Sequence, residues 1–373
     1  MPHHQRGARQ LHGVCLSATH ELCVEWDEDA ASTLVAAGFP GVCGDVRDMK
    51  HYDGLKHVDM IWASPPCQAF STAGSRQGAL DDRNGWPWTL DVIDHLRSRG
   101  VGPEWVVCEN VMGMTYHRGD CDRSDAMRCP GCYWNDWIQP EFKKRFDWVG
   151  VAVINAADFG VPQHRRRVFL VGGPRPVRWP EPTHCRVEKI DQQVMFGPRL
   201  KPWVSIREAL GIDATIIGGG TNPRKSSEAD TRSYRDITNE PSTTVAAVQV
   251  GNAGPFVLND SGAASTTLGT GVPGSEPWRL DKPSPAITSR DWRGARHQKF
   301  DPTRGPMTAA DATWRAMGRR RLTWRECAAL QGFPGSYPFT GRTQASMYKQ
   351  VGNAVCPKVS EVLGLCVLKA MMQ

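Results

Sequence analysis

The stretch that decides the fold is residues 61–70, which read IWASPPCQAF. Together with Met60, its first residues form an apolar run typical of a buried strand, and two prolines then end the strand and hold Cys67 on a rigid turn. A thiol is nucleophilic only as the thiolate, which needs partial exposure in an electropositive setting, and a loop at a strand end can provide that. Cys67 is therefore a candidate nucleophile, with an ordinary buried or loop cysteine as the alternative.

The sequence around this stretch alternates between strand and helix patterns. Residues 22–26 and 41–46 read as strands, and the alanine-rich residues 29–38 between them read as a helix closed by glycine. Residues 88–97 form an amphipathic helical pattern, and residues 105–111 (WVVCENV) form a second long apolar strand. This spacing predicts a doubly wound α/β sheet, a fold that binds ligands beyond the carboxyl ends of its strands.

Four polar side chains fall at such strand ends: Glu25, Asp45, Cys67 and Glu109. Further along, residues 141–147 (EFKKRFD) read as helical and residues 149–155 as a strand. Arg165 and Arg167 alternate on the strand that follows Gln163, so we expect both to point toward one face. A basic edge strand is the alternative for this pair.

Composition limits the class of protein. The chain has 373 residues, enough for two domains, and a formal net charge of +6, which suits a polyanionic partner without requiring one. No run approaches the roughly 20 apolar residues of a membrane span, and the first residues lack the apolar stretch of a signal peptide. We therefore expect an intracellular protein whose twelve cysteines are thiols or metal ligands rather than disulfides.

Five short motifs occur in a fixed order along the chain. They are PCQ at 66–68, ENV at 109–111, QHRRR at 163–167, RRLTWRECAALQGFP at 320–334 and GNAV at 352–355. Each would be weak alone, but chance occurrence of all five in order is negligible. In this order they resemble the DNA (cytosine, carbon 5) methyltransferase family. The resemblance implies a doubly wound S-adenosylmethionine-dependent methyltransferase fold with a second, smaller, irregular β-rich target-recognition domain.

The resemblance also implies an activity, which is methyl transfer from S-adenosylmethionine to carbon 5 of cytosine in specific DNA sequences. Cys67 would add to carbon 6 of a flipped base and so make carbon 5 nucleophilic. Glu109 would hold a proton near ring nitrogen 3, and Arg165 would steady the carbonyl side of the base. The base that removes the proton from carbon 5 is not identified by the sequence.

For the cofactor, the family pattern assigns Glu25 to the ribose hydroxyls, Trp26 to the adenine face and Asp45 to the adenine amino group. Further residues assigned to this site are Pro66, Asn353 and Val355. Family members begin with an Asp-x-Phe-x-Gly-x-Gly turn, whereas here the corresponding region reads QRGARQLHGVCLSATH, with two glycines and no preceding strand. Either the start of this motif lies upstream or the chain is a degenerate, weak or inactive relative.

DNA contacts are expected in two places. The loop 71–84 after Cys67 would lie over DNA, and from residue 174 onward the composition shifts toward Pro, Gly, Thr, Ser and Arg, which predicts the recognition domain. The residues assigned to DNA are Ser71, Arg76, Arg167, Arg290 and Arg293, and a solvated loop is the alternative for any one of them. The expected boundaries are 1–185 for the catalytic domain, 186–318 for recognition and 319–373 for a segment that returns to the catalytic domain.

An insert at 117–134 after the ENV strand carries His117, Cys121, Cys129 and Cys132. Cys-Pro-Gly-Cys resembles a zinc knuckle, and four such ligands can close a tetrahedral structural zinc site that would brace an otherwise coreless insert. Loose thiols are the alternative.

The partners implied are double-stranded DNA, no membrane, and a restriction endonuclease if the chain belongs to a restriction-modification pair. We expect a monomer in the cytoplasm, encoded by a bacterium or a phage. The rival hypotheses are a catalytically silent DNA-binding relative, which the missing glycine turn favours, and an RNA cytosine methyltransferase on the same scaffold.

Overall fold

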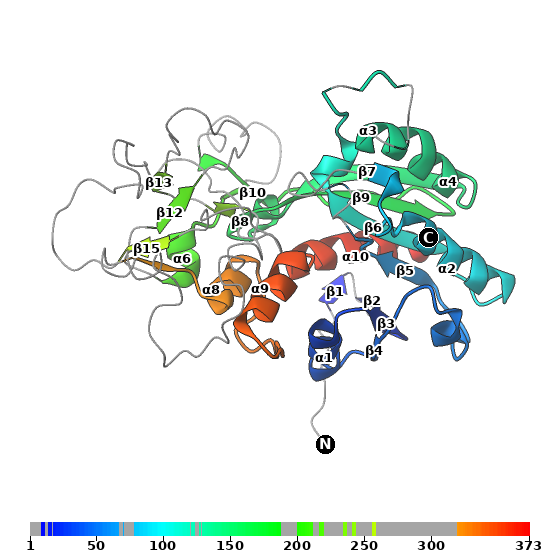
Figure 1. Cartoon of the computed structure of the whole chain (residues 1–373), viewed down its shortest axis with the longest axis horizontal. Helices are drawn as coiled ribbons and strands as arrows, with labels where there is room; N and C mark the ends of the chain where they lie inside the picture. The colour runs from blue at the N-terminus through cyan, green and yellow to red at the C-terminus, as the bar shows by residue number, and fades with distance from the viewer. Residues whose placement is uncertain are drawn as a thin grey trace. The chain divides into compact units, whose positions relative to one another are not determined.

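The computed structural model describes residues 9–11, 14–16, 18–66, 70, 78–119, 121–123, 127, 129–187, 200–211, 216–219, 234–236, 241–243, 256–258 and 319–373. The chain divides into two compact units (Figure 1). Unit 1 consists of residues 1–153, 167–180 and 360–373, and unit 2 of residues 154–166 and 181–359. Each unit is described by itself.

The main sheet has the strand order β5-β6-β9-β7. β5 (Met60–Ala63) and β6 (Trp105–Val111) are parallel, and β9 (Arg166–Gly173) runs antiparallel to β6, with β7 (Trp148–Asn155) on its other side. The apolar run of β6 is buried along almost its whole length, as expected for a central strand. The predicted strands at 60–62, 105–111 and 149–155 are therefore present.

A second parallel pair carries the strand ends expected to hold the cofactor. β3 (Cys23–Glu25) pairs with β4 (Gly41–Cys43), with Glu25 opposite Cys43. Among the described residues no strand joins this pair to β5, so the predicted sheet is divided into two pieces. Upstream, β1 (Arg9–Leu11) and β2 (Val14–Leu16) form a short antiparallel pair within the region compared with the glycine turn, and the residues before Arg9 lie outside the described residues.

Helix boundaries follow the capping residues in the sequence. α1 (Glu28–Ala36) begins where the Asp27 carboxylate accepts from the N–H groups of Asp29 and Ala30, both at 3.1 Å, and ends before Gly38, which has a φ of +82°. α2 (Trp86–Ser98) connects the parallel strands β5 and β6 in sequence, with Pro in its first turn. Short 3₁₀ turns connect these elements: η1 (Met49–Tyr52), η2 (Gly78–Leu80), η3 (Met112–Thr115) and η5 (Ala156–Phe159).

After η3, the insert forms a nearly continuous helical segment. It consists of α3 (Pro130–Tyr133), the π-helical turn η4 (Trp134–Ile138) and α4 (Gln139–Lys143). The helix predicted at 141–147 therefore ends earlier, because β7 must begin at Trp148. This segment is not coreless as predicted, because Tyr133, Trp134 and Ile138 are buried in the main core of unit 1 with Trp86 of α2.

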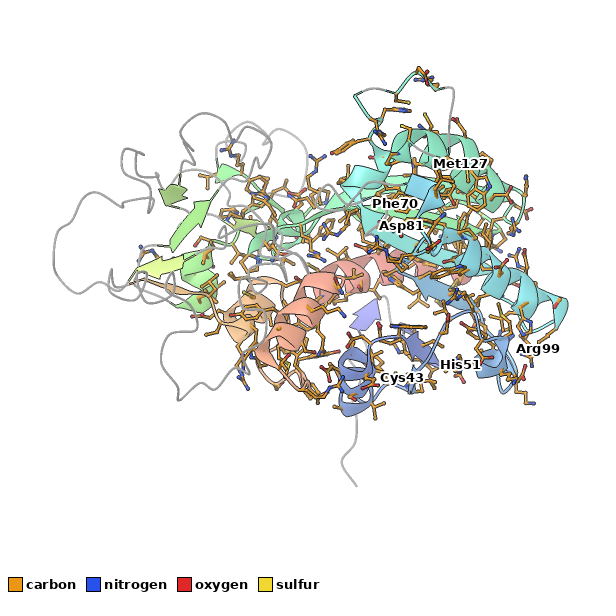
Figure 2. All side chains as sticks on the ribbon, viewed as in Figure 1. Cys43, His51, Phe70, Asp81, Arg99 and Met127 are labelled. Atoms are coloured by element: carbon orange, nitrogen blue, oxygen red, sulfur yellow. The ribbon has the colours of Figure 1, made fainter. Side chains whose placement is uncertain are left out.

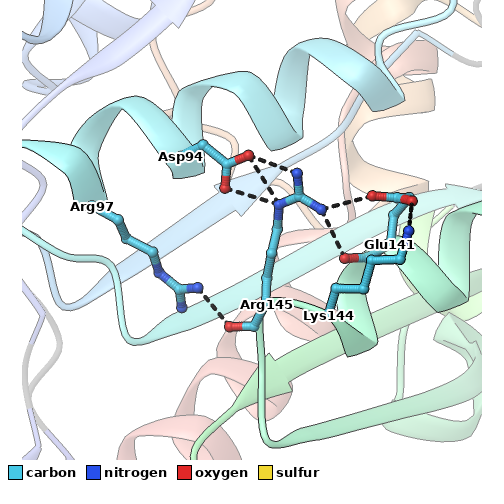
Figure 3. A network of polar contacts seen from close by, with 5 residues as sticks. All are labelled: Asp94, Arg97, Glu141, Lys144 and Arg145. Carbon is cyan, nitrogen blue, oxygen red and sulfur yellow. Dashed lines mark hydrogen bonds and ion pairs between the residues drawn. The ribbon is translucent and has the colours of Figure 1, made fainter.

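An arginine joins α2 to α4 at the edge of this core (Figure 3). The Arg145 guanidinium donates to both carboxylate oxygens of Asp94 on α2, at 2.6 and 2.9 Å, and to Glu141 Oε2 of α4 at 2.8 Å. Arg97 donates to the backbone oxygen of Arg145 at 2.5 Å. The two helices are thereby held together by a charge-assisted network rather than by a single surface pair.

Unit 2 has a smaller core around Ile206, Leu322, Leu330 and Val351. α8 (Trp324–Leu330) begins at the predicted capping box, in which Thr323 Oγ1 accepts from the Glu326 N–H and the Glu326 carboxylate accepts from the Thr323 N–H. The remaining elements described here are α6 (Ile206–Leu210), α9 (Gln344–Asn353), β8 (Gln163–His164), β10 (His184–Cys185), β11 (Lys201–Pro202), β12 (Ile216–Gly219), β13 (Tyr234–Asp236), β14 (Ser242–Thr243), β15 (Phe256–Leu258) and β16 (Arg319–Arg321).

α10 (Pro357–Met371) leads from unit 2 back into unit 1, so the catalytic unit is discontinuous in sequence. The boundaries of the units differ from the predicted 185 and 319. Residues 154–166 group with unit 2, in which β8 pairs with β14, and residues 319–359 group there because α8 and α9 build its core.

The helical stretch Gln344–Met371 has the length and mean hydropathy of a membrane span. It is interrupted, because Ala354 adopts an extended backbone after α9 and Pro357 begins α10. With 10 and 15 residues, neither helix reaches the roughly 17 residues that span a bilayer. Val351, Leu363 and Val367 are buried within the protein, as expected for helices that build a core.

Candidate active site

The carboxyl ends of β5 and β6 are tied together at the ENV motif. The buried Asn110 side chain donates to the backbone oxygen of Pro65 at 3.1 Å, while its own Oδ1 accepts from the Val111 N–H at 2.9 Å. Gly85, which precedes α2, packs so closely that a Cβ there would lie 2.6 Å from Pro66 Cδ. The Pro-Pro turn is therefore held from the strand side and from the helix side.

Glu109 forms an ion pair with Arg167 of β9, in which Nε lies 3.0 Å from Oε1. The antiparallel register places Arg167 opposite Val111, which brings the two charged groups to the same end of the sheet. The two side chains are only 8% and 12% exposed, so their charges meet largely shielded from water. This pair, next to the Pro65–Pro66 turn, is the main charged feature of the described part of the base-binding edge.

Arg165 lies in a different setting from the one predicted. It occupies the single-residue break between β8 and β9 rather than a strand position, and it is 3% exposed. Its guanidinium donates to the backbone oxygens of Gly352 and Ala354 at 2.9 and 2.8 Å. Gln331 donates to the same Ala354 oxygen at 2.7 Å, so both side chains brace the GNAV turn within unit 2.

Asn353 and Val355, the two residues of this turn assigned to the cofactor, are sequence neighbours of Gly352 and Ala354, whose backbone oxygens accept these hydrogen bonds. Asn353 is the last residue of α9 and is exposed, and Val355 is half-buried in the turn before α10.

Cys67, the candidate nucleophile, lies outside the described residues. The nearby Cys108 of β6 is no substitute, because complete burial raises the pKa of its thiol far above the usual range. Among the DNA-binding candidates, Ser71, Arg76, Arg290 and Arg293 also lie outside the described residues, and Arg167 forms the ion pair with Glu109.

The cofactor candidates lie together at the carboxyl ends of β3 and β4. Glu25 Oε1 accepts from the Asp27 N–H at 2.9 Å, and the Glu25 backbone oxygen accepts from Gly44 at 3.0 Å. The Trp26 side chain is 70% exposed, which leaves its face open to a flat ligand. Asp45 is held by Arg47, whose guanidinium hydrogen bonds lower the pKa of that carboxyl.

These groups match the adenosine half of S-adenosylmethionine. A carboxylate suits ribose hydroxyls, an open indole suits adenine, and a second carboxylate suits an exocyclic amine. Pro66, the remaining cofactor candidate of unit 1, lies in the turn that follows β5. No glycine-rich turn for the methionine half occurs among the described residues of the N-terminal region.

The insert gathers four metal-ligand atoms, all within 4.8 Å of one another, from His117, Cys121, Cys129 and Cys132. His117 Nδ1 lies 3.3, 3.5 and 4.0 Å from the sulfurs of Cys132, Cys129 and Cys121, and the Cys121 and Cys132 sulfurs are 3.4 Å apart. With Zn–S of about 2.3 Å and Zn–N of about 2.0 Å, a tetrahedral site has edges of about 3.5–3.8 Å. The donor set therefore fits a zinc ion.

Two backbone features support this cluster. The Arg118 N–H donates to the Cys129 sulfur at 3.4 Å, as a backbone amide does around a thiolate. A Cβ on Gly131 would lie 2.8 Å from the His117 backbone nitrogen, so the glycine in Cys-Pro-Gly-Cys allows the two ligand segments to meet.

The sequence assigned Arg165 to the target base and Arg167 to DNA, and it did not indicate the ion pair between Arg167 and Glu109. Both assignments stay predictions. The antiparallel pairing of β9 with β6 allows this ion pair, and antiparallel pairing is not legible from strand patterns alone. Asn110 was also missed, although its place in ENV after an apolar strand could have indicated it.

The family model described as C-5 cytosine-specific DNA methylase matches residues 10–368. The type II methyltransferase M.AquIA of Picosynechococcus sp. is 37% identical over 157 residues, which are 41% of this chain and 59% of that relative. M1.HphI of Haemophilus parahaemolyticus is 27% identical, with 86% of this chain and 71% of the relative covered. The crystal structure of S. pombe Dnmt2 methyltransferase is 16% identical, with a TM-score of 0.47 and coverage of 94% and 90%.

The match to the family model spans nearly all of the chain, including both strand-end sites and the GNAV turn. The chain therefore belongs to the C-5 cytosine-specific DNA methylase family, which methylates cytosine in DNA with S-adenosylmethionine as the methyl donor.

Proposed function

We propose that this chain carries out the reaction of its family with Cys67 as nucleophile, Glu109 as the group facing ring nitrogen 3, and Arg167 as the guanidinium beside it. One observation carries the assignment, namely the Glu109–Arg167 ion pair at the strand end next to the Pro65–Pro66 turn. Arg165, which the family pattern assigns to the carbonyl side of the base, stays part of this proposal, and its hydrogen bonds to the backbone oxygens of Gly352 and Ala354 would hold it in place.

The chemistry follows from these positions. The Cys67 thiolate adds to carbon 6 of a flipped cytosine, and electron density moves toward carbon 5 and ring nitrogen 3. A protonated Glu109 gives its proton to nitrogen 3, and Arg167 balances the charge of the carboxylate that remains and steadies the base. S-adenosylmethionine supplies the methyl group. A base then removes the proton from carbon 5, and Cys67 leaves as thiolate.

Cofactor binding would use the β3–β4 end. Glu25 would accept from the ribose hydroxyls, Trp26 would cover the adenine, and Asp45 would accept from its amino group. Because Arg47 competes for the Asp45 carboxylate, we expect this side chain to move when the cofactor binds. Asn353, Val355 and Pro66 would complete the site.

The test is methyl transfer. Protein, mixed-sequence duplex DNA and methyl-labelled S-adenosylmethionine are incubated, and the digested nucleosides are analysed for 5-methylcytosine. Label in 5-methylcytosine that disappears in Cys67→Ser supports the proposal. With DNA containing 5-fluorocytosine the wild type should form a covalent adduct, and absence of both signals would refute the reaction.

We also propose a structural zinc ion in the cluster of His117, Cys121, Cys129 and Cys132. The supporting observations are the near-tetrahedral distances and the amide donated to the Cys129 sulfur. Elemental analysis of purified protein should find about one zinc per chain, as a closed four-ligand site holds one ion. Cys121→Ser should lower that content, and zinc-free wild type would refute the site.

The partner would be duplex DNA, recognised through residues 186–318, most of which lie outside the described residues. We propose a monomer, since one active site and one recognition domain suffice for one target base, and scattering-detected gel filtration tests it. If the chain has a restriction endonuclease partner, DNA methylated by this protein should resist cleavage by a nuclease encoded next to it. The family favours DNA over RNA, and a competition between duplex DNA and tRNA decides this point.

A further inference from the structure

We infer that the metal cluster sets the position of the chain that follows the candidate nucleophile, so that metal occupancy regulates the reaction at Cys67. The inference rests on the proposed zinc site and the proposed reaction. It concerns three described points of the chain after Cys67: Phe70, η2 and Asn84. All three contact the insert that carries the ligands.

The first contact is a stack of aromatic rings. Tyr133 directly follows the ligand Cys132, and its ring stacks on Phe70 with the centroids 5.9 Å apart and an interplanar angle of 8°. On its other side, Tyr133 stacks on Trp137 at 4.9 Å. Phe70 and Tyr133 are 1% and 0% exposed, so the stack is rigid. Phe70 follows Cys67 by three residues, which couples the insert to the nucleophile's own loop.

The second contact is a buried hydrogen bond from the same tyrosine. Asn84 donates to the Tyr133 hydroxyl at 2.9 Å and to the Ala79 backbone oxygen at 3.2 Å, and its Oδ1 accepts from the Trp86 N–H at 3.3 Å. Asn84 therefore joins η2, the start of α2 and the insert at one point. A buried amide of this kind is costly to leave unsatisfied, so its three partners move together.

The third contact comes from the other side of the cluster. The Ala79 N–H of η2 donates to the backbone oxygen of Met127, two residues before the ligand Cys129, at 2.9 Å. The residues labelled Phe70, Asp81 and Met127 in Figure 2 mark this region. The chain after Cys67 is thus held at Phe70 and at Ala79, in each case by a residue one or two positions from a metal ligand.

The stability of these three contacts should depend on whether the metal ion is bound. Binding of a structural ion contributes its free energy to the folding of the residues that carry the ligands. The described contacts that bring the two ligand segments together are few: those between the ligand atoms, the Arg118 N–H that donates to the Cys129 sulfur and the Gly131 N–H that donates to the Tyr116 oxygen. A small displacement of a reacting group lowers the reaction rate strongly. If Phe70 is held less firmly, we therefore expect slower addition of the Cys67 thiolate to the base.

The cofactor end should be insensitive to the same change. Val24 of β3 packs with a second cluster around Tyr52, Val92 and Leu96, which contains no residue of the insert and shares only Ile61 with the main core. Loss of metal should therefore slow thiolate addition while leaving S-adenosylmethionine affinity unchanged. A merely structural role for the metal would instead weaken both, because the whole unit would be destabilised.

The experiment compares the full-length wild type with two variants and a control. Cys121→Ser removes a ligand that makes no contact with Phe70 or Asn84. Tyr133→Phe keeps every ligand and the ring stack but removes the hydroxyl that Asn84 contacts. Cys366→Ser removes a half-buried thiol of α10 outside the cluster and serves as the control. Zinc content, amide hydrogen exchange, adduct formation with 5-fluorocytosine DNA and cofactor affinity are measured for each.

We expect Cys121→Ser to lose zinc and to show about tenfold faster amide exchange at residues 78–84. Its single-turnover adduct rate should fall about tenfold or more, with cofactor affinity unchanged. Tyr133→Phe should keep its zinc and show a smaller change in the same exchange and rate, and Cys366→Ser should match the wild type.

Loss of zinc with wild-type exchange and adduct rates would overturn the inference, as would an equal loss of cofactor affinity. A wild type without zinc would overturn it together with the metal site. If the wild type binds zinc but forms no adduct and no 5-methylcytosine, the proposed reaction fails, while faster exchange at 78–84 in Cys121→Ser would still support the coupling.

Discussion

Replacement of Arg167 by alanine tests the assignment of the base-binding edge. The change removes the guanidinium that lies 3.0 Å from Glu109 Oε1, where the two side chains are 12% and 8% exposed. Breaking a buried pair from one side costs about 3–5 kcal/mol, and the residual exposure here reduces that to about 2–4 kcal/mol. If the guanidinium acts mainly in the transition state, the same energy corresponds to about a 30- to 1000-fold loss in rate.

The assay is single-turnover adduct formation with 5-fluorocytosine DNA in the presence of S-adenosylmethionine, together with urea unfolding to separate rate from stability. Arg166→Ala is the matched control, because it removes the same formal charge from an exposed neighbour on β9. Equal slowing by Arg166→Ala and Arg167→Ala would show that only net charge toward DNA matters. A wild-type rate in Arg167→Ala would refute the role of the ion pair.

Three further changes probe the surroundings. Gly85→Ala should lower the methylation rate about tenfold with little loss of zinc, because its Cβ would lie 2.6 Å from Pro66 Cδ and must displace the turn; steady-state kinetics and elemental analysis check this. Trp26→Ala should raise the Kd for S-adenosylmethionine about fivefold or more, measured by calorimetry, and unchanged affinity would remove Trp26 from the site. The hydrogen bonds of Arg83 lower the pKa of Asp81 in the folded protein. Its stabilising effect is therefore complete above the unfolded pKa of about 3.9 and is lost as pH falls through the lower folded value. Urea midpoints of wild type and Asp81→Asn should differ at pH 7 and approach each other as pH falls below the unfolded pKa of about 3.9, and a constant difference would contradict the sign.

Much of the catalytic unit could be predicted because its signals are local. The apolar runs of β5, β6 and β7 lie where the pattern places them, and the helix boundaries at Asp27 and Thr323 follow from capping chemistry. The four metal-ligand candidates are also brought together, as their spacing indicated. In each case neighbouring residues along the chain carry the information, so one sequence suffices.

What the sequence did not indicate concerns relations between distant segments. The direction of β9 against β6 decides which arginine meets Glu109, and no pattern within either strand reports that direction. The insert was expected to lack a core because its first half is polar, but Tyr133 and Trp134 pack on residues more than forty positions earlier. The unit boundaries were missed for the same reason, since pairing of β8 with β14 groups residues 154–166 with unit 2.

The division of the sheet into β3–β4 and β5–β6–β9–β7 has a consequence for assembly and engineering. Among the described residues, β3 and β5 each have one strand neighbour, so each presents a row of backbone donors and acceptors on its other side. Such an edge is a template for an added strand. A peptide or fused segment that pairs with β3 would lie beside the strand that ends at Glu25, the residue proposed to bind the ribose. The fold therefore offers a place to change affinity for the methyl donor without changing a residue of the metal cluster.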